Sequence, residues 1–268
     1  MRYVFDHDYH IHSELSSCSR DPEQTPARIL QYAKDYGLKT VCLTDHYWDS
    51  AVPGASRWYE PQNFEHISKA KPLPVADGVT FLFGCETDFD RNHTLGVPPA
   101  RFDDFGFIVI PTTHLHMKGF TITEEDIVSV EKKAKLWVTR MEALLAMDLP
   151  FYKIGIAHPA CCLLHKTPRE EYLRLLDLIP EADMVRVFTK AADLGVGIEL
   201  NSDDMSFSDA EADTVLRMFR IAKRCGCKFY CGSDAHAPIG FEKMKTVIER
   251  AIDLLGLTED DKFHIKSR

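Results

Sequence analysis

The sequence contains no apolar run that approaches the roughly 18 residues of a membrane-spanning helix, so we expect no membrane partner. Its opening residues, MRYVFDHDYH, lack the basic region and apolar stretch of a signal peptide. Internal repeats, low-complexity tracts and linker-like segments are also absent. These absences argue against a collagen-like, coiled-coil or disordered chain and make a cytoplasmic enzyme the starting expectation.

Positive charge is scarce. The 32 Lys and Arg residues are outnumbered by 41 Asp and Glu residues, which gives a formal net charge of −9. This balance argues against long nucleic acid as a partner, because proteins that coat it neutralise phosphates with cationic side chains. A small phosphorylated substrate stays compatible, because bound cations can supply positive charge locally.

The eight cysteines include no CxxC pair. Several lie in apolar runs, where small buried thiols are common. We therefore expect reduced thiols and no disulfide framework.

Seven short β-rich runs alternate with amphipathic helical stretches, which is typical of βα units and a parallel sheet. With 268 residues, of which 45% are hydrophobic, the chain can bury a substantial core. An α/β barrel of this length commonly forms one domain. The predicted strands are 3–12, 39–45, 80–88, 105–113, 153–157, 196–201 and 228–233.

Residues that begin and end helices support this alternation. Thr25 and Thr167 each precede a proline and are predicted N-caps, and Ser208 has Glu211 at capping-box spacing. Glycines follow helical runs where a left-handed C-cap is needed, at Gly37, Gly195, Gly226 and Gly256. Apolar residues three or four apart in 124–147 predict one buried helix face, made of Ile127, Val130, Ala134, Trp137, Met141 and Leu145.

Residues 47–78 interrupt the alternation with a segment rich in proline, aromatic and polar residues. A connection of this length is either functional or a sign of misassigned elements. We expect a loop with a short helix near 62–70 that lies over a site. The alternative is a surface excursion without a role.

Nearly every predicted strand ends in potential metal ligands. Because the carboxyl ends of parallel barrel strands meet at one mouth, side chains that are distant in sequence would converge there. A single histidine such as His158 could instead be a hydrogen-bonded core residue, but a buried unpaired carboxylate costs several kcal/mol and favours a cation partner. In chain order, the strand-end residues are His10, His12, Asp45, His46, Glu86, His114, His116, His158, Glu199, Asp234 and His236.

Imidazole combined with carboxylate suits Zn²⁺, Mn²⁺ or Fe²⁺ better than Ca²⁺ or Mg²⁺. About nine candidate ligands, at three or four per ion, predict two or three divalent ions. Multinuclear sites of this kind activate a bridging water and clamp the attacking and leaving oxygens of a phosphoryl transfer.

The strand-end motifs resemble those of the PHP superfamily, named for polymerase and histidinol phosphatase. They are DYHIHS at 8–13, TDH at 44–46, GCE at 84–86, THLH at 113–116, AHP at 157–159, IELN at 198–201 and SDAH at 233–236. The resemblance implies an α/β fold, a distorted (β/α)7 TIM-like barrel. Residues 1–268 would form one domain, with 47–78 as a loop insertion over the active-site face.

The resemblance also implies a trinuclear site. The first ion would be held by His10, His12, Glu86 and Asp234. The second would share Glu86 and add His114 and His158. The third would take His46, His236 and a ligand from the loop after His12.

The sequence departs from the family pattern in that loop. It has Ser17 and Cys18 where many members have His, or Asp one position earlier. Cys18 could bind as a thiolate, or Asp21 could reach in; otherwise the third site is weak or empty. His116 shares a face with His114, so either could bind the second ion, and we favour His114.

Two carboxylates are expected to act behind the ligands. Asp45 precedes His46 and is predicted to orient it as a hydrogen-bond acceptor. Glu199 either does the same for another ligand or lines the barrel interior.

The leading hypothesis is a metal-dependent phosphoesterase in which a hydroxide that bridges the first two ions attacks phosphorus in line. Asp234 or His236 would protonate the leaving alkoxide, and loss of Glu86 should abolish turnover. The predicted phosphate-binding side chains are Arg20, Arg57 and Lys118.

Within this class the substrate would be a small phosphomonoester, histidinol phosphate or similar, with a nucleotide or oligonucleotide phosphodiester as the alternative. The aromatic residues Trp48, Trp58 and Tyr59 could stack on an imidazole or a nucleobase. Outside this class, an amidohydrolase also uses an HxH strand but usually bridges its metals with a modified Lys. A non-catalytic metal-binding module is the last alternative.

Overall fold

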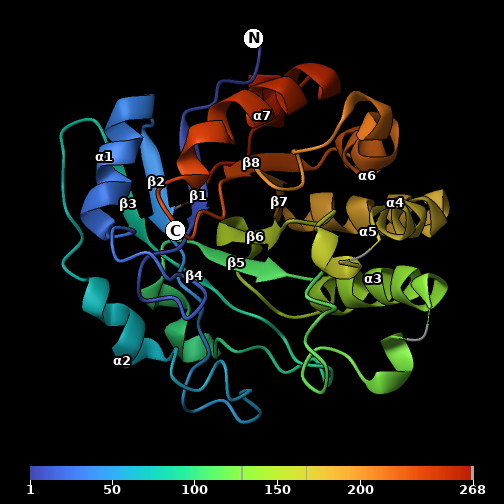
Figure 1. The fold of residues 1–268 in the computed structure, drawn as a ribbon, viewed down its shortest axis with the longest axis horizontal. Coiled ribbons are helices and arrows are strands. Elements are labelled where there is room, and N and C mark those ends of the chain that lie inside the picture. Colours follow the sequence, from blue (N-terminus) through green and yellow to red (C-terminus); the bar gives the residue numbers. More distant parts are fainter. Residues whose placement is uncertain (128, 167, 267–268) are drawn as a thin grey trace.

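We describe a computed structural model that covers residues 1–127, 129–166 and 168–266. In these residues, eight short parallel strands form two sheets (Figure 1). The first sheet contains β1 (His7–Ile11), β2 (Thr40–Leu43) and β3 (Thr80–Phe83). The second contains β4 (Cys85–Glu86), β5 (Ile108–Pro111), β6 (Ile154–Ala157), β7 (Gly197–Asn201) and β8 (Lys228–Gly232).

Backbone hydrogen bonds join the two sheets at two places. The Asp234 amide, just after β8, donates to the His10 carbonyl of β1 across 2.7 Å. At the second place, the Glu86 amide of β4 donates to the Asp45 carbonyl, just after β2, across 3.0 Å. The carboxyl ends of strands from both sheets are therefore brought together.

The predicted strand 80–88 is interrupted at Gly84. A Cβ atom at this position would lie 2.4 Å from the Phe107 carbonyl oxygen and 2.7 Å from the Cys42 sulfur. Glycine is therefore needed where the chain leaves its pairing with β2 and begins to pair with β5. This interruption is why eight strands occur in the described part of the chain where seven were predicted.

Helices surround the strands in Figure 1. The longer ones are α1 (Pro26–Tyr36), α3 (Val130–Leu145), α4 (Arg169–Leu178), α5 (Glu181–Leu194), α6 (Ala212–Arg224) and α7 (Gly240–Leu255). The short α2 (Phe64–Ile67) and the 3-10 turn Ser68–Ala70 confirm the helix predicted near 62–70. Further 3-10 turns are Pro99–Asp104, Glu124–Ile127, Phe151–Lys153, Cys162–Leu164, Asp209–Glu211 and Glu259–Asp261.

Most of the predicted helix ends are confirmed. The Thr25 side chain accepts a hydrogen bond from the Arg28 amide, and the four predicted C-cap glycines have positive φ. The Ser208–Glu211 capping box is present, although it caps a 3-10 turn that leads into α6. Thr167 lies outside the described residues.

The helix predicted over 124–147 is confirmed only in part. A 3-10 turn precedes α3, whose own N-cap is Ser129. The predicted apolar face is buried in α3, at Val130, Ala134, Trp137, Met141 and Leu145, while the side chain of Ile127 lies outside the described part.

Aromatic side chains fill the space enclosed by the strands. Tyr9, Phe107 and Tyr230 come from or border β1, β5 and β8, and the Phe107 and Tyr230 rings have centroids 5.1 Å apart. Gly155 of β6 makes room for them, since a Cβ there would lie 2.4 Å from the Tyr230 ring. Phe263, near the C-terminus, packs into the same cluster.

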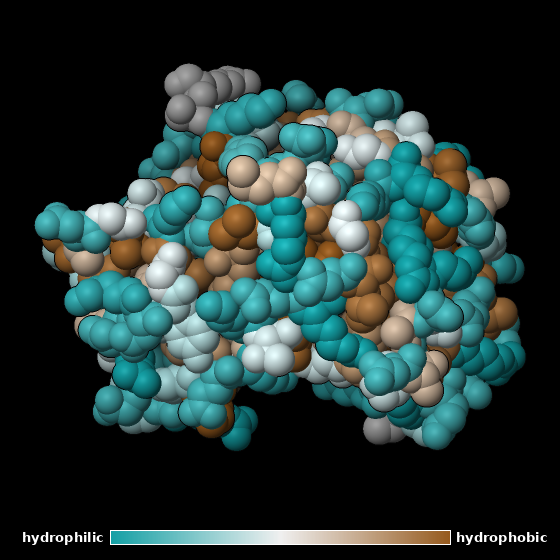
Figure 2. Space-filling view, turned by 90° about the horizontal axis from the view of Figure 1, so that it is seen from above, coloured by the Kyte–Doolittle hydropathy of each residue, from teal (hydrophilic) through white to brown (hydrophobic). Residues whose placement is uncertain are grey.

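Polar side chains cover most of the face shown in Figure 2, with apolar side chains in scattered spots between them. Among the described residues, no helix combines the length and hydropathy that crossing a membrane requires. All eight cysteines belong to the described part, and none of them forms a disulfide there.

Candidate metal centre

The predicted ligand residues meet in one region, and all but Cys18 lie at or just after the carboxyl ends of the strands. His10 belongs to β1 and Glu86 to β4, while His12, His46, His114 and His158 follow strands β1, β2, β5 and β6. Asp234 and His236 follow β8. Parallel strands that end at a common rim produce this convergence of residues more than 220 positions apart in the sequence.

Three groups of side chains have ligand atoms within 4.8 Å of one another. All nine predicted ligand residues fall into these groups, and His12 and Glu86 belong to two groups each. The groups are His10, His12, Glu86 and Asp234; then Glu86, His114 and His158; then His12, Cys18, His46 and His236.

The first group is packed around fully buried imidazoles. His12 Nε2 lies 3.2 Å from His10 Nε2, 3.3 Å from Glu86 Oε2 and 3.1 Å from Asp234 Oδ1. Burial lowers the pKa of His12, but hydrogen bonds to Asp234 and Glu86 outweigh it and raise the pKa to about 9. A divalent cation between these atoms would take the place of the shared protons, as metal binding to histidine requires.

Glu86 belongs to two of the groups and lies against His46 of the third. Burial raises the pKa of its carboxyl, but the surrounding imidazoles of His46 and His10 hold that pKa well below its usual value. Its Oε2 atom is 3.0 Å from His46 Nδ1, and its Oε1 atom is 3.4 Å from His158 Nε2. The carboxylate is therefore positioned to serve two neighbouring sites.

Most of the imidazoles are fixed through one ring nitrogen, which leaves the other directed at the ligand groups. His10 Nδ1 donates to Glu199 Oε1 across 2.8 Å, and His158 Nδ1 is 2.8 Å from Thr113 Oγ1. This is the usual support of metal-binding histidines, in which a protein acceptor fixes the tautomer and the ring plane. The donor set and its orientation thus fit divalent metal ions.

Asp88 gives similar support to His114 and was not singled out in the sequence. Its Oδ2 atom accepts from His114 Nδ1 across 2.7 Å and from the Tyr59 hydroxyl across 2.9 Å. The buried Arg140 guanidinium lies 3.9 Å from Oδ1. Its position two residues after Glu86 was the available signal, because residues i and i+2 of an extended segment face the same side.

The prediction for Asp45 is wrong. Its carboxylate accepts hydrogen bonds from the Ser13 amide and from the Ser13 and Ser16 hydroxyls, at 2.7 to 2.8 Å. Ser16 Oγ in turn lies 3.0 Å from His12 Nδ1. Asp45 therefore supports His12 through a serine instead of orienting the adjacent His46, because the loop after β1 folds back over it.

For Glu199, the structure favours the orienting alternative. Besides accepting from His10, this carboxylate accepts from the His158 amide across 2.6 Å through Oε2. One buried side chain of β7 thus connects two members of different ligand groups.

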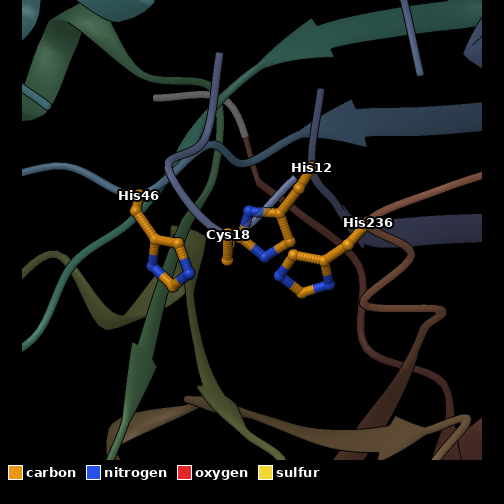
Figure 3. Close-up of side chains that lie close together, drawn as sticks. All are labelled: His12, Cys18, His46 and His236. Atoms are coloured by element: carbon orange, nitrogen blue, oxygen red, sulfur yellow. The ribbon is translucent and has the colours of Figure 1, made fainter. Parts of the chain in front are cut away.

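In the third ligand group, Cys18 and not Asp21 lies close to the histidines. Figure 3 shows the imidazoles of His12, His46 and His236 gathered around the Cys18 side chain. Asp21 instead accepts from the Glu23 amide within its own turn. Burial raises the pKa of the Cys18 thiol, so this sulfur needs a bound cation to become a thiolate.

Burial and membership of a ligand group distinguish His114 from His116. His114 is buried and belongs to the group with Glu86 and His158, whereas His116 is exposed and belongs to none of the three groups.

Two members of the groups, His158 and Asp234, have positive φ angles of 28° and 53°. Such strained backbone is commonly kept where a functional geometry requires it.

The model of the PHP domain family matches residues 8–256 of the sequence. The chain belongs to the PHP domain family. A sequence comparison with curated proteins finds no match.

Two solved structures resemble this PHP protein over nearly its whole length. Histidinol phosphate phosphatase from Lactococcus lactis, solved with zinc, L-histidinol and phosphate, gives a TM-score of 0.60 at 17% identity, over 92% of this chain and 93% of that one. A putative histidinol phosphatase from Listeria monocytogenes gives 0.58 at 12% identity, over 90% of this chain and 98% of that one. These likenesses show the fold, and the TIM-like barrel prediction is confirmed.

Six ligand-group residues of the PHP protein form the floor of a pocket of about 540 Å³: Cys18, His46, Glu86, His114, Asp234 and His236. Ser56, Arg57 and Trp58 line it from the segment 47–78, and Lys118 lines it from the loop after β5. Arg20, the third predicted phosphate-binding residue, is exposed and is not part of this lining. The loop after β1 turns Ser16 and Gln24 inward and leaves Arg20 on its outer side.

The aromatic residues of 47–78 do not all face the pocket. Trp48 and Tyr59 are buried against Phe120, with ring centroids 5.2 and 5.5 Å from it. Trp58 is half-buried and lines the pocket next to His46. Of the three predicted stacking residues, Trp58 is thus the one that a pocket ligand can reach.

Proposed function

We propose that this PHP protein is a metal-dependent phosphoesterase that hydrolyses a small phosphomonoester. The observation that carries the proposal is the set of three ligand groups that share His12 and Glu86 at the floor of one pocket. Two or three divalent ions bound there would lower the pKa of water and neutralise phosphate oxygens. Zinc is the first choice over manganese or iron, because the Lactococcus phosphatase was solved with zinc and phosphate.

Asp234 and His236 are ligand-group members that line the pocket and that a leaving group can reach. Their side chains are 21% and 34% exposed, whereas those of His10 and His12 are fully buried. We assign them proton transfer to the leaving alkoxide, as a general acid must contact the reacting oxygen. Arg57 and Lys118 would bind phosphate oxygens from the pocket wall.

We further propose that residues 1–268 form one PHP-type domain in which 47–78 is an insertion over the active-site face. The wall formed by Ser56, Arg57 and Trp58 supports this role. Histidinol phosphate or a similar small ester is the substrate that the solved relatives suggest first.

The test is phosphate release from p-nitrophenyl phosphate by protein loaded with Zn²⁺ or Mn²⁺. We expect turnover by the native chain and its loss in His10→Ala and Glu86→Gln, with the far-ultraviolet circular dichroism unchanged. His264→Ala, which removes an exposed histidine outside the three ligand groups, is the matched control and should keep full activity.

Three other outcomes would replace the proposal. Faster turnover of bis-p-nitrophenyl phosphate identifies a phosphodiesterase. Amide hydrolysis without phosphate release identifies an amidohydrolase, and inertness of the metal-loaded protein identifies a metal-binding module.

A further inference from the structure

The pocket above the ligand groups has walls of two kinds. Its apolar lining consists of Trp58, Met117, Phe120 and Leu163. Its polar lining outside the ligand groups consists of Ser56, Arg57, His116 and Lys118. Beyond the reacting oxygen, the group to which the phosphate is attached must contact these walls.

Carboxylates are missing from these walls. Among the described residues that line the pocket, the carboxylates are Glu86 and Asp234, and both belong to the ligand groups on the floor. Arg57 and Lys118 place two cations on the walls. Lys118 has Glu124 as an ion-pair partner at 3.6 Å, but that glutamate is 80% exposed, so the pair is weak and open to exchange.

We propose that the substrate's leaving group is an alcohol or phenol that contains an aromatic ring and carries no positive charge. The inference rests on the proposed phosphoesterase function and narrows its substrate class. It departs from the example of the Lactococcus protein, whose structure contains L-histidinol.

The position of Trp58 favours an aromatic ring in the leaving group. Its indole is held edge-on between Tyr59 and His46, with ring centroids 4.8 and 4.7 Å away. Tyr59 is itself fixed by its hydrogen bond to Asp88. A rigid, half-buried aromatic surface binds a second ring at low entropic cost, and offset or edge-to-face ring pairs add about 0.5–1.5 kcal/mol to area burial.

The positive charge of the walls argues against a leaving group that is a cation. An ammonium group such as that of histidinol is bound well only where a carboxylate or several oxygen acceptors replace its water shell. A cation–π contact with Trp58 would offset about 0.5–1 kcal/mol of the cost of removing this water shell at an exposed site. Arg57 and Lys118 oppose it, since two like charges several ångströms apart repel by about 1 kcal/mol even in water.

The experiment compares three phenyl phosphates that differ only in the charge of the para substituent: carboxymethyl, ethyl and aminomethyl. L-histidinol phosphate is measured beside them. We expect kcat/KM for phosphate release to fall in the order anionic, neutral, cationic, with about a tenfold loss for the cationic ester relative to the neutral one. L-histidinol phosphate should also be turned over more slowly than the neutral ester.

Substitutions of Arg57 and Trp58 test whether these side chains cause the preference. Arg57→Met should reduce the advantage of the carboxymethyl ester over the aminomethyl ester, while Lys245→Ala, an exposed lysine on α7, should leave it unchanged. Trp58→Ala should raise KM for all three phenyl esters, and Trp58→Phe should restore much of the loss.

A binding measurement gives a readout that does not depend on turnover. Calorimetric titration of the metal-loaded protein should show tighter binding of 4-hydroxyphenylacetate than of 4-(aminomethyl)phenol. Tighter binding of the amine, or L-histidinol phosphate as the best of the four esters, overturns the inference and leaves the phosphoesterase function standing. Phosphate release from none of the esters contradicts the proposed function itself.

Discussion

At the scale of single residues, the candidate centre depends on partners that hold the imidazoles in place. His114 is held by Asp88, which also accepts from Tyr59 and lies beside Arg140. Arg140 is in turn fixed by three backbone carbonyls, those of Phe89, Thr112 and Thr121. The support for one ligand therefore extends well beyond the residues that could bind metal.

We expect Asp88→Asn to lower metal affinity by about 10–100-fold without unfolding the protein. An amide oxygen can accept from the His114 ring or from Tyr59, but it lacks the charge that makes the imidazole a stronger ligand. Zinc titration followed by calorimetry measures the change, with Asp35→Asn on the exposed surface of α1 as the control. Unchanged affinity in Asp88→Asn would show that His114 needs no such partner.

A second residue-scale prediction concerns Cys162, which lies beside Cys161 at the start of a 3-10 turn. A hydrogen bond from the Cys161 thiol, with help from nearby Arg169 and Lys166, lowers the pKa of the exposed Cys162 to about 6. Since the thiolate is the reactive form, alkylation by iodoacetamide should speed up as the pH rises through about 6 and level off above 7.

Peptide mass spectrometry after timed alkylation measures this rate for each cysteine. In Cys161→Ala the midpoint should move up towards that of an ordinary thiol, because the largest cause of the shift is removed. The same midpoint in both proteins would count against the hydrogen bond as its cause.

How far single residues could be predicted depended on whether their partners were near in sequence. Except for Cys18, which lies in the loop after β1, the ligands were recognisable because each lies at the end of a strand, a pattern visible in the sequence. Asp45 was paired with the adjacent His46, but the structure gives it Ser13 and Ser16, over 28 residues away. Asp88 was missed because its partner His114 comes from another strand end.

At the scale of elements, alternation and capping residues located the strands and helices, but close approaches between neighbours modified them. The interruption at Gly84 depends on the Phe107 carbonyl of another chain segment. No local pattern indicates such an approach. For the same reason a glycine inside a strand, Gly232 of β8, could not be recognised as essential from sequence alone.

Gly232→Ala should strongly destabilise the protein. An added Cβ would lie 1.8 Å from Glu199 Oε1 and 2.8 Å from His10 Cβ, both of which are buried. Overpacking of a core typically costs about 1–3 kcal/mol, and displacement of Glu199 would also disturb His10. Urea unfolding measures the loss.

Gly106→Ala is the matched control for this substitution. Its Cβ would meet Leu82 and the Phe83 carbonyl at 3.5 to 3.6 Å, which is ordinary contact. We expect it to change the free energy of unfolding by less than about 1 kcal/mol. Equal losses in both variants would mean that the contact with Glu199 is not the cause.

At the scale of the whole molecule, residues from position 10 to position 236 meet because parallel strands end on one rim. This convergence was predictable from strand order alone. The walls of the pocket were predicted only in part, because they come from loops whose paths are set by packing: Arg57 and Lys118 line the pocket as expected, whereas Arg20 does not. The segment 47–78 was expected over the site, yet only the structure separates Trp58, which lines the pocket, from the buried Trp48.

Metal binding should stabilise the whole fold, because the ligand groups exist only in the folded state. A ligand at 100 times its dissociation constant adds about 2.7 kcal/mol of stability, which corresponds to a rise in Tm of roughly 5–10 °C for a chain of this size. Thermal unfolding of chelator-treated protein, with and without Zn²⁺ or Mn²⁺, measures the rise. Ca²⁺ should produce a much smaller one, since imidazole is a poor ligand for it.

Glu86 and Cys18 then distinguish a shared cluster from separate sites. Because Glu86 belongs to two of the three ligand groups, Glu86→Gln should remove most of the Zn²⁺-dependent rise in Tm. Cys18→Ser affects one group and should remove a smaller part. Each variant is compared with its own metal-free form, so that any direct effect of the substitution on stability cancels. An undiminished rise in Glu86→Gln would mean that zinc stabilises the protein from somewhere other than the strand ends.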